Sequence, residues 1–267
     1  MFSKKLIYWL IIFNLIPPLA FGQAKVGNDL IKIKGITSLD KIHPGIRFQI
    51  AIIIDISEGW YLNAHCPFDE TLISTDIRFE NESGLTFSDI IYPDPIIKSF
   101  RFSDQKLAVY EGEVIIGSRV SVSKKFTAKE LVISGRLTYQ ACNNDMCLIP
   151  IEVEINIPLE IAGLEQRVHR INDALFSPLE ARWANVHYNR GKSYEVKGLI
   201  NEAILECEEA ILLKPNNLNY LFKLSMLHFR KGNYDKAITI IKKAEVLNPK
   251  DESIQMKLKE YEEMKNR

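Results

Sequence analysis

Two cysteines, Cys142 and Cys147, are the residues whose types and spacing point most directly to chemistry. They lie between two runs of alternating apolar and polar residues, 131–139 and 151–157. Such runs, joined by a short polar segment, predict a β-hairpin, and the Asn-Asn-Asp stretch at 143–145 suits a tight or left-handed turn. Because a hairpin brings its ends together, we expect the thiols to reach the Cα separation of about 4.4–6.8 Å that a disulfide requires.

The chemistry of this pair has two interpretations. Closing the loop of six residues from Cys142 to Cys147 stabilises a protein by only about 2 kcal/mol in the chain-entropy model, so a hairpin staple gains little. Exchange chemistry favours two thiols close in sequence, because the second can resolve a mixed disulfide formed by the first. Spacing alone does not choose between a structural clip and a redox couple.

Short segments around the cysteines form a series. The cysteine segment runs Tyr139-Gln-Ala-Cys142 to Cys147 and Pro150, before a strand ending Ile157-Pro158-Leu159. Upstream, in order, stand Gly59-Trp-Tyr-Leu-Asn63, Tyr92-Pro93 and Tyr110-Glu-Gly-Glu113. Over about residues 27–160 this series resembles the N-terminal periplasmic domain of the thiol–disulfide interchange protein DsbD. The resemblance implies an immunoglobulin-like fold that shuttles electrons through its cysteine pair.

The resemblance also implies neighbours for the sulfurs. The positions that approach the cysteine pair in the DsbD domain match Tyr61 and Asn63. A mobile cap over the disulfide matches residues 96–104, where Phe100 and Phe102 can shield the sulfurs. The acidic pair of the family's cap is absent, and basic residues stand there instead: Lys98 and Arg101.

Two kinds of partner follow from the resemblance. A membrane electron carrier of the DsbD type supplies reducing equivalents, and thioredoxin-like exported proteins exchange with Cys142 and Cys147, as in a protein-disulfide reductase. Neither a membrane-spanning domain nor a thioredoxin domain with a C-x-x-C motif is recognisable in these 267 residues, so we expect separate partners. The alternative is a non-enzymatic binding or scaffold protein of the cell envelope with a structural hairpin disulfide.

Strand patterns dominate the first part of the chain. The run 47–56 is apolar enough to be largely buried, and further runs predict strands at 73–80, 85–92, 107–116 and 126–139. Short strands separated by frequent turn residues predict a β-sandwich, in agreement with the immunoglobulin-like fold. We assign residues 23–162 to this domain.

The hydrophobic period changes after residue 162. One helical face over 163–176 carries apolar residues: Leu164, Val168, Ile171 and Leu175. Ser177, followed by Pro178 and Glu180, predicts the start of the next helix, with the serine as its N-cap. The change of period predicts two separable domains with a boundary near 160–163, the second being helical over 163–267.

A repeat with a step of 34 residues occupies the helical part, since Ala203 recurs as Ala237. Other small or helix-ending residues recur with the same step: Gly198, Ala210 and Pro215 as Gly232, Ala244 and Pro249. With Gly191 and Tyr194 this resembles the tetratricopeptide repeat over 184–217 and 218–251, with His228 in place of the usual tyrosine. Residues from Asp251, including Ile254, Leu258 and Tyr261, predict a C-terminal capping helix. The repeat implies either a concave surface for an unknown protein ligand or a docking unit.

The N-terminus predicts a signal peptide over residues 1–22, and hence export to the periplasm. Lys4 and Lys5 precede the apolar run 6–15, which Pro17 ends, and the small residues Ala20 and Gly22 suit cleavage. Disulfides form in such an oxidising compartment.

The remaining features point away from other functions. Lys+Arg 34 balances Asp+Glu 34, so no strong field favours nucleic acid, and no motif predicts a metal site or a cofactor. Cys66, beside His65, is expected to be a loop or strand-end cysteine, and Cys207 a small buried hydrophobe between helices.

Overall fold

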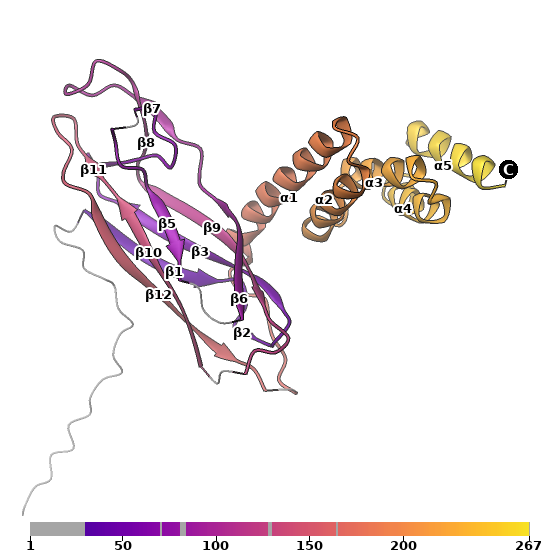
Figure 1. Cartoon of the computed structure of the whole chain (residues 1–267), viewed down its shortest axis with the longest axis horizontal. Coiled ribbons are helices and arrows are strands. Elements are labelled where there is room, and N and C mark those ends of the chain that lie inside the picture. Colours follow the sequence, from indigo (N-terminus) through magenta and orange to yellow (C-terminus); the bar gives the residue numbers. More distant parts are fainter. Residues whose placement is uncertain (1–29, 70, 81–83, 128–129, 164, 267) are drawn as a thin grey trace, which may run out of the picture.

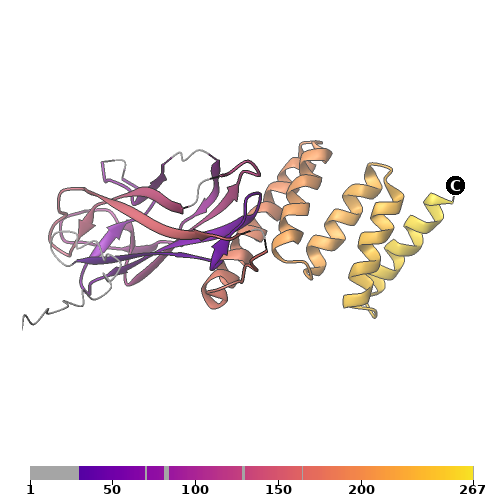
Figure 2. The same ribbon diagram turned by 90° about the horizontal axis from the view of Figure 1, so that it is seen from below.

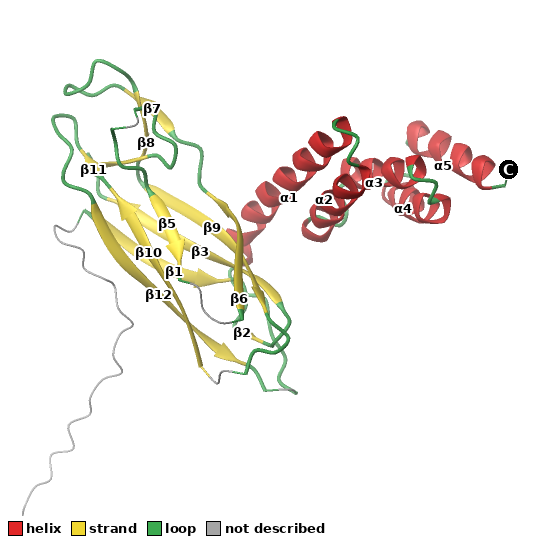
Figure 3. Ribbon diagram, in the orientation of Figure 1, coloured by secondary structure: helices red, strands yellow, loops and turns green. Residues whose placement is uncertain are grey.

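The computed structural model describes residues 30–69, 71–80, 84–127, 130–163 and 165–266. Strands form the N-terminal part and helices the C-terminal part (Figure 1, Figure 3). The predicted fold class, an immunoglobulin-like β-sandwich followed by a tetratricopeptide-repeat region, is confirmed. The predicted signal peptide, residues 1–22, lies outside the described residues.

Two four-stranded sheets form the sandwich. The first sheet has the order β1 (Ile31–Thr37), β3 (Arg47–Ile56), β9 (Glu113–Val122) and β6 (Leu85–Ile91). The second has the order β2 (Lys41–Ile42), β12 (Ile151–Ile161), β10 (Glu130–Tyr139) and β5 (Asp76–Phe79). Alternate residues of the central strands, such as Ile52 and Ile133, are buried in the shared core.

A third, smaller sheet lies at one end of the sandwich (Figure 1). Its order is β11 (Ala141–Cys142), β4 (Tyr61–Asn63), β8 (Leu107–Tyr110) and β7 (Ile96–Lys98). The prediction of a single strand at 107–116 is therefore wrong. Gly112, with φ 64°, lies between β8 and β9, and the chain passes there from the small sheet to the first large sheet.

The helices stack in a row that leads away from the sandwich (Figure 2). They are α1 (Asp173–Val196), α2 (Ile200–Leu213), α3 (Leu218–Arg230), α4 (Tyr234–Leu247) and α5 (Glu252–Lys265). Ala203 and Ala237 are fully buried, as close helix packing requires. Gly198 and Gly232 have φ near 80° and open space around a notional Cβ, so these two glycines serve the left-handed turn between helices rather than packing. No helix in the described part of the chain has the length and apolar character needed to cross a bilayer.

The predicted helix over 163–176 is wrong. The described residues of that stretch up to Ile171 run along the loop after β1, where Leu39 and Arg170 form an antiparallel bridge and Ile171 N–H donates to Ser38 O at 2.9 Å. Helix α1 begins at Asp173, so the predicted start at Ser177 is wrong too. The apolar period alone predicted a helix here, but the backbone N–H and C=O groups of this stretch form their hydrogen bonds with the sandwich instead.

The first half of α1 covers the outer face of the first sheet. Phe176, Leu179 and Trp183 are buried there against Ala51 of β3 and Ile91 of β6. Small residues beneath the helix permit the close approach. A Cβ at Gly117 would lie only 2.9 Å from the Trp183 ring. The Trp183 Nε1–H also donates to Asp89 O at 2.6 Å, so the helix is fixed by both packing and a hydrogen bond.

Charged residues continue this interface next to Trp183. The Asp89 carboxylate lies 3.2 Å from Arg119, 2.7 Å from Arg190 and 3.4 Å from His187. Hydrogen bonding with His187 is the main cause that holds the pKa of Asp89 well below its usual range. Asp89 has φ 50°, which is uncommon for a residue other than glycine, and it lies at a register shift of β6. The bulge thus turns the carboxylate toward the helices.

Candidate redox site

The cysteines in the loop between β10 and β12 form a disulfide. The two strands pair antiparallel with Tyr139 opposite Ile151, so the predicted hairpin is confirmed. The bond joins Cys142 to Cys147, as predicted. Their Cα atoms lie 3.9 Å apart, closer than expected, and the two residues face each other as an isolated antiparallel bridge.

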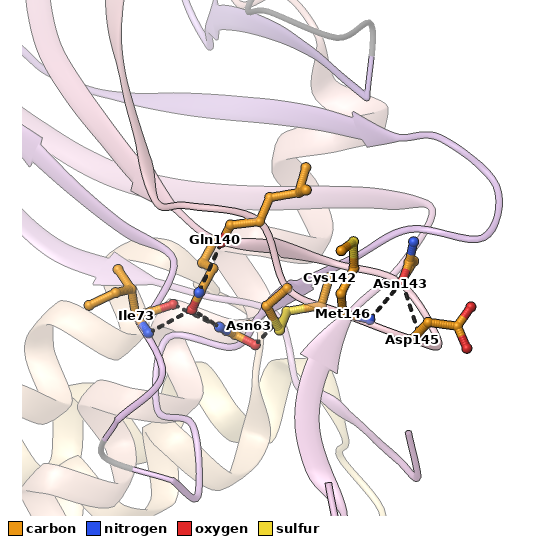
Figure 4. The surroundings of a disulfide bond; sticks show 9 residues. Asn63, Ile73, Gln140, Cys142, Asn143, Asp145 and Met146 are labelled. Atoms are coloured by element: carbon orange, nitrogen blue, oxygen red, sulfur yellow. Dashed lines mark hydrogen bonds between the residues drawn. A yellow bond between two sulfur atoms is a disulfide. The ribbon is translucent and has the colours of Figure 1, made fainter. Parts of the chain in front are cut away.

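Asn143 shapes the turn between the cysteines. Its Oδ1 accepts hydrogen bonds from the N–H groups of Asp145 and Met146, each at 2.9 Å (Figure 4). Its own N–H donates to Met146 O at 2.9 Å, and Leu148 N–H donates to Ala141 O at 2.8 Å. No residue of the turn has a positive φ. The polar stretch therefore makes a tight side-chain-supported turn, not a left-handed one.

The two cysteines differ in accessibility. Cys142 lies in β11 and is fully buried. Cys147 follows the turn and is partly exposed. Solvent therefore meets the disulfide from the Cys147 side.

Tyr61 and Asn63 share one face of the small sheet with Cys142. Strand β11 pairs with β4 so that Cys142 lies opposite Tyr61, and Asn63 follows two residues later on the same face. Asn63 is fully buried, and its Oδ1 lies 3.7 Å from Cys142 Sγ (Figure 4). The structure thus brings both residues to the cysteine, while their role in the chemistry remains a prediction.

The segment after β7 lies beside the cysteine turn, since Arg101 N–H donates to Asn144 O at 3.0 Å. Phe100 is buried, and its ring meets Tyr61 edge-on with 5.2 Å between ring centroids. Phe102 is exposed, and its ring centroid lies 5.3 Å from that of Phe100. Phe100 therefore packs on Tyr61 and Phe102 on Phe100, and shielding of the sulfurs remains a prediction.

Lys98 interacts with the same tyrosine. Its ammonium donates to Tyr61 Oη, lies 4.0 Å from the centre of that ring, and is 3.7 Å from Glu111. The hydrogen bond to Tyr61 is the main cause that raises the pKa of Lys98. The basic residue at the cap position is therefore held by Tyr61 and Glu111.

Gln140 belongs to the site, although no role was predicted for it. It immediately precedes β11, and its side chain hydrogen-bonds Asn63 and Ile73 (Figure 4). Its place in the Tyr-Gln-Ala-Cys segment was the only signal in the sequence.

The other two cysteines are free. Cys66 is exposed just after β4, in agreement with the strand-end interpretation. Cys207 is fully buried between helices, and a Cβ at Gly191 would lie 2.9 Å from its sulfur. Burial raises the pKa of Cys207 to about 12. The prediction that Cys207 is a packing residue is confirmed.

Both parts of the chain match known protein families. Residues 37–158 match the family described as the N-terminal region of the thiol:disulfide interchange protein DsbD. Residues 184–217 and 218–251 match the tetratricopeptide repeat, at the bounds predicted from the sequence. Among curated proteins no significant match is found.

Two solved structures illustrate the similarity. The N-terminal periplasmic domain of ScsB from Proteus mirabilis has 21% identity and a TM-score of 0.37 over 52% of this chain and 50% of that chain, so only half of that domain's length is matched. The second tetratricopeptide domain of human RPAP3, solved with an HSP70 peptide, has 20% identity and a TM-score of 0.28 over 30% of this chain and 66% of that chain. On the family matches, residues 37–158 belong to the family of the DsbD N-terminal region, and residues 184–251 form two tetratricopeptide repeats.

Proposed function

We propose that this protein is an exported thiol–disulfide exchange module. Its Cys142–Cys147 pair passes reducing equivalents from a membrane electron carrier to thioredoxin-like exported proteins. The observation that carries the proposal is a disulfide in a short loop at one end of the sandwich, with one cysteine buried and the other partly exposed. The family match supports it, because that family is a part of a thiol:disulfide interchange protein.

In the proposed exchange, Cys147 meets the partner. A thiolate of the reduced carrier attacks Cys147 Sγ, the Cys142–Cys147 bond breaks, and Cys142 leaves as a thiolate that takes up a proton. The second thiol of the carrier then releases Cys147, and the carrier becomes a disulfide. The reduced pair repeats these steps on the next protein: Cys147 attacks its disulfide, Cys142 resolves the mixed disulfide, and the partner leaves with two thiols.

The reduction potential of the pair tests this function. Equilibration with glutathione or dithiothreitol buffers should give a value between about −270 and −120 mV, whereas structural disulfides usually lie below about −300 mV. In cells, Cys142→Ser should accumulate a mixed disulfide on Cys147, whereas Cys147→Ser should not, with Cys66→Ser as the control. A potential well below about −300 mV, with no protein trapped by either variant, would leave a structural disulfide on a non-enzymatic scaffold.

The helical repeats are proposed to act as an adaptor for a protein ligand. A hollow of about 470 Å³ lies between α1 and the turn before α3, with Asn185, Asn217 and Tyr220 in its wall. Asn185→Trp should fill this hollow and reduce the mixed disulfide trapped by Cys142→Ser. Leu205→Trp, at an exposed position of α2, is the matched control. Equal trapping in both variants would contradict the adaptor role and leave the exchange function standing.

A further inference from the structure

The side chain of Gln140 joins three segments that meet at the disulfide. Its Oε1 accepts hydrogen bonds from Asn63 Nδ2 at 2.9 Å and from Ile73 N–H at 3.1 Å. Its Nε2 donates to Leu148 O at 3.1 Å. One carboxamide therefore connects β4 with the loop that follows it (Figure 4), and both with Leu148, the residue after Cys147.

The backbone partners fix the orientation of this carboxamide. Ile73 N–H can only donate and Leu148 O can only accept, so rotating the Gln140 amide by half a turn would oppose donor to donor and acceptor to acceptor. Gln140 Oε1 and Ile73 O then both accept from Asn63 Nδ2, at 2.9 and 3.1 Å. The remaining polar atom of Asn63, Oδ1, is thereby directed at Cys142 Sγ, 3.7 Å away.

A hydrogen-bond acceptor beside Cys142 Sγ favours the thiol form of Cys142 over its thiolate. The reduced Cys142 can donate its S–H to Asn63 Oδ1, whereas its thiolate would face the partial negative charge of that oxygen. Complete burial of Cys142 acts in the same direction, because desolvation disfavours the charged form. Cys147 is partly exposed, so water can stabilise its thiolate. The charged side chains on neighbouring elements have partners of their own: Lys98 with Glu111 and Arg101 with Asp145.

We propose that Gln140 is a positioning residue for the exchange reaction. It holds the Asn63 carboxamide so that Oδ1 keeps the Cys142 thiol protonated while Cys147 ionises. The inference rests on the proposed exchange function and adds to it the device that sets which cysteine is the nucleophile.

The proton held at Cys142 has a place in the reaction. The Cys147 thiolate attacks a partner disulfide R–S–S–R′, forming the Cys147–S–S–R bond and releasing R′–S⁻. Cys142 then gives up its proton, its thiolate attacks Cys147 Sγ, the bond to R breaks, and the departing R–S⁻ takes up the proton. The pair becomes a disulfide, and the partner is reduced by two electrons.

Alkylation of single cysteines tests the proposal. Cys142 is titrated in the full mature chain carrying Cys66→Ser and Cys147→Ser, and Cys147 in the chain carrying Cys66→Ser and Cys142→Ser. Iodoacetamide rates between pH 6 and 11 give the midpoint for each thiol, and single-cysteine chains avoid coupled titration. The Cys142 midpoint should lie above the Cys147 midpoint. Gln140→Ala and Asn63→Ala should each lower the Cys142 midpoint by about one pKa unit, since a net hydrogen bond corresponds to about that shift.

The pH midpoint separates positioning from a general structural role. If Gln140 merely supports the loop, Gln140→Ala raises alkylation rates at every pH and leaves the midpoint in place, which would overturn the proposal. Gln166→Ala is the matched control. It removes another side-chain acceptor of a backbone N–H, that of Gly163 at 2.7 Å, in the loop after β12, and should leave both midpoints unchanged.

Two further results decide the remaining cases. A Cys142 midpoint at or below that of Cys147 in the chains with intact Gln140 and Asn63 overturns the proposal, even if the alanine variants lose their native circular dichroism. The exchange function is tested separately by the reduction potential of the pair. If the reduction potential is that of a structural disulfide and the pH midpoints are as expected, the exchange function is refuted and the ionisation order stands. If the reduction potential is that of an exchange couple and the pH midpoints are not as expected, only the role of Gln140 is refuted.

Discussion

Replacing Trp183 with alanine should separate the sandwich from the helices. The indole is fully buried on the first sheet, and burying about 150–250 Å² of aromatic surface at about 25 cal/mol per Å² contributes about 4–6 kcal/mol. Alanine also removes the hydrogen bond from Nε1 to Asp89 O, worth about 1 kcal/mol net. Large-to-small substitutions of this kind lose about 3–5 kcal/mol, so we expect a loss of about 4 kcal/mol in the free energy of unfolding.

Urea unfolding of the mature protein, followed by circular dichroism, measures this loss. With a slope of about 2–3 kcal/mol per M urea, the midpoint should fall by about 1.3–2 M. Leu205→Ala, at an exposed position of α2, is the control and should change stability by less than about 0.5 kcal/mol. If Trp183→Ala destabilises no more than this control, the contact between helix and sheet does not hold the two parts together.

Three further predictions concern the same interface and the free thiols. Because the pKa of Asp89 is lowered in the folded protein, its carboxylate stabilises the fold above the unfolded-state pKa of about 3.9, and this stabilisation is lost as the pH falls through the folded-state pKa. In Asp89→Asn the free energy of unfolding should therefore fall less between pH 5 and 3 than in the unsubstituted protein. An equal fall in both proteins would show that Asp89 is not the source of this pH dependence. Gly117→Ala should destabilise by about 1–3 kcal/mol through overpacking against the Trp183 ring, seen as a lower thermal midpoint, and an unchanged midpoint would show that the ring can shift. In the native protein at pH 8, maleimide should modify exposed Cys66 and spare buried Cys207, and mass mapping that finds equal labelling would refute the packing assigned to Cys207.

Local sequence patterns predicted those parts of the fold that depend on residues close together in the chain. Strand 47–56 was found from its apolar run, because most of its side chains are at least partly buried. The hairpin around the cysteines was found from the alternation of apolar and polar residues in its two strands. The repeat bounds came from the step of 34 residues between small buried positions such as Ala203 and Ala237.

The errors lie where distant segments meet. The stretch up to Ile171 has a helical period, but its backbone pairs with Ser38 and Leu39, more than 100 residues earlier. The contact between Asp89 and His187 joins β6 to α1 in the same way. No local pattern encodes such partners. The domain boundary predicted near 160–163 remains a prediction, and separating the parts there must break the buried contacts of α1 with the sheet.

The site was foreseen only in part for the same reason. The cysteine pair was found from its spacing, and Tyr61 and Asn63 from the resemblance. Gln140 was missed because its role depends on the orientation of two amides, fixed by backbone groups of Ile73 and Leu148. Residue type and spacing do not carry that information.

Helix α1 belongs to both parts of the molecule. Its first half packs on the sandwich through Trp183, and its second half packs on α2 through Gly191. The helix has 24 residues and is about 36 Å long. In the proposed function, a protein bound on the repeats is presented to the disulfide at an effective concentration set by this rigid helix, not by the reach of a flexible linker. Each residue inserted in α1 between Trp183 and Gly191 would turn the repeats by about 100° around the helix axis. The orientation of such a partner relative to the disulfide would therefore depend on the number of inserted residues.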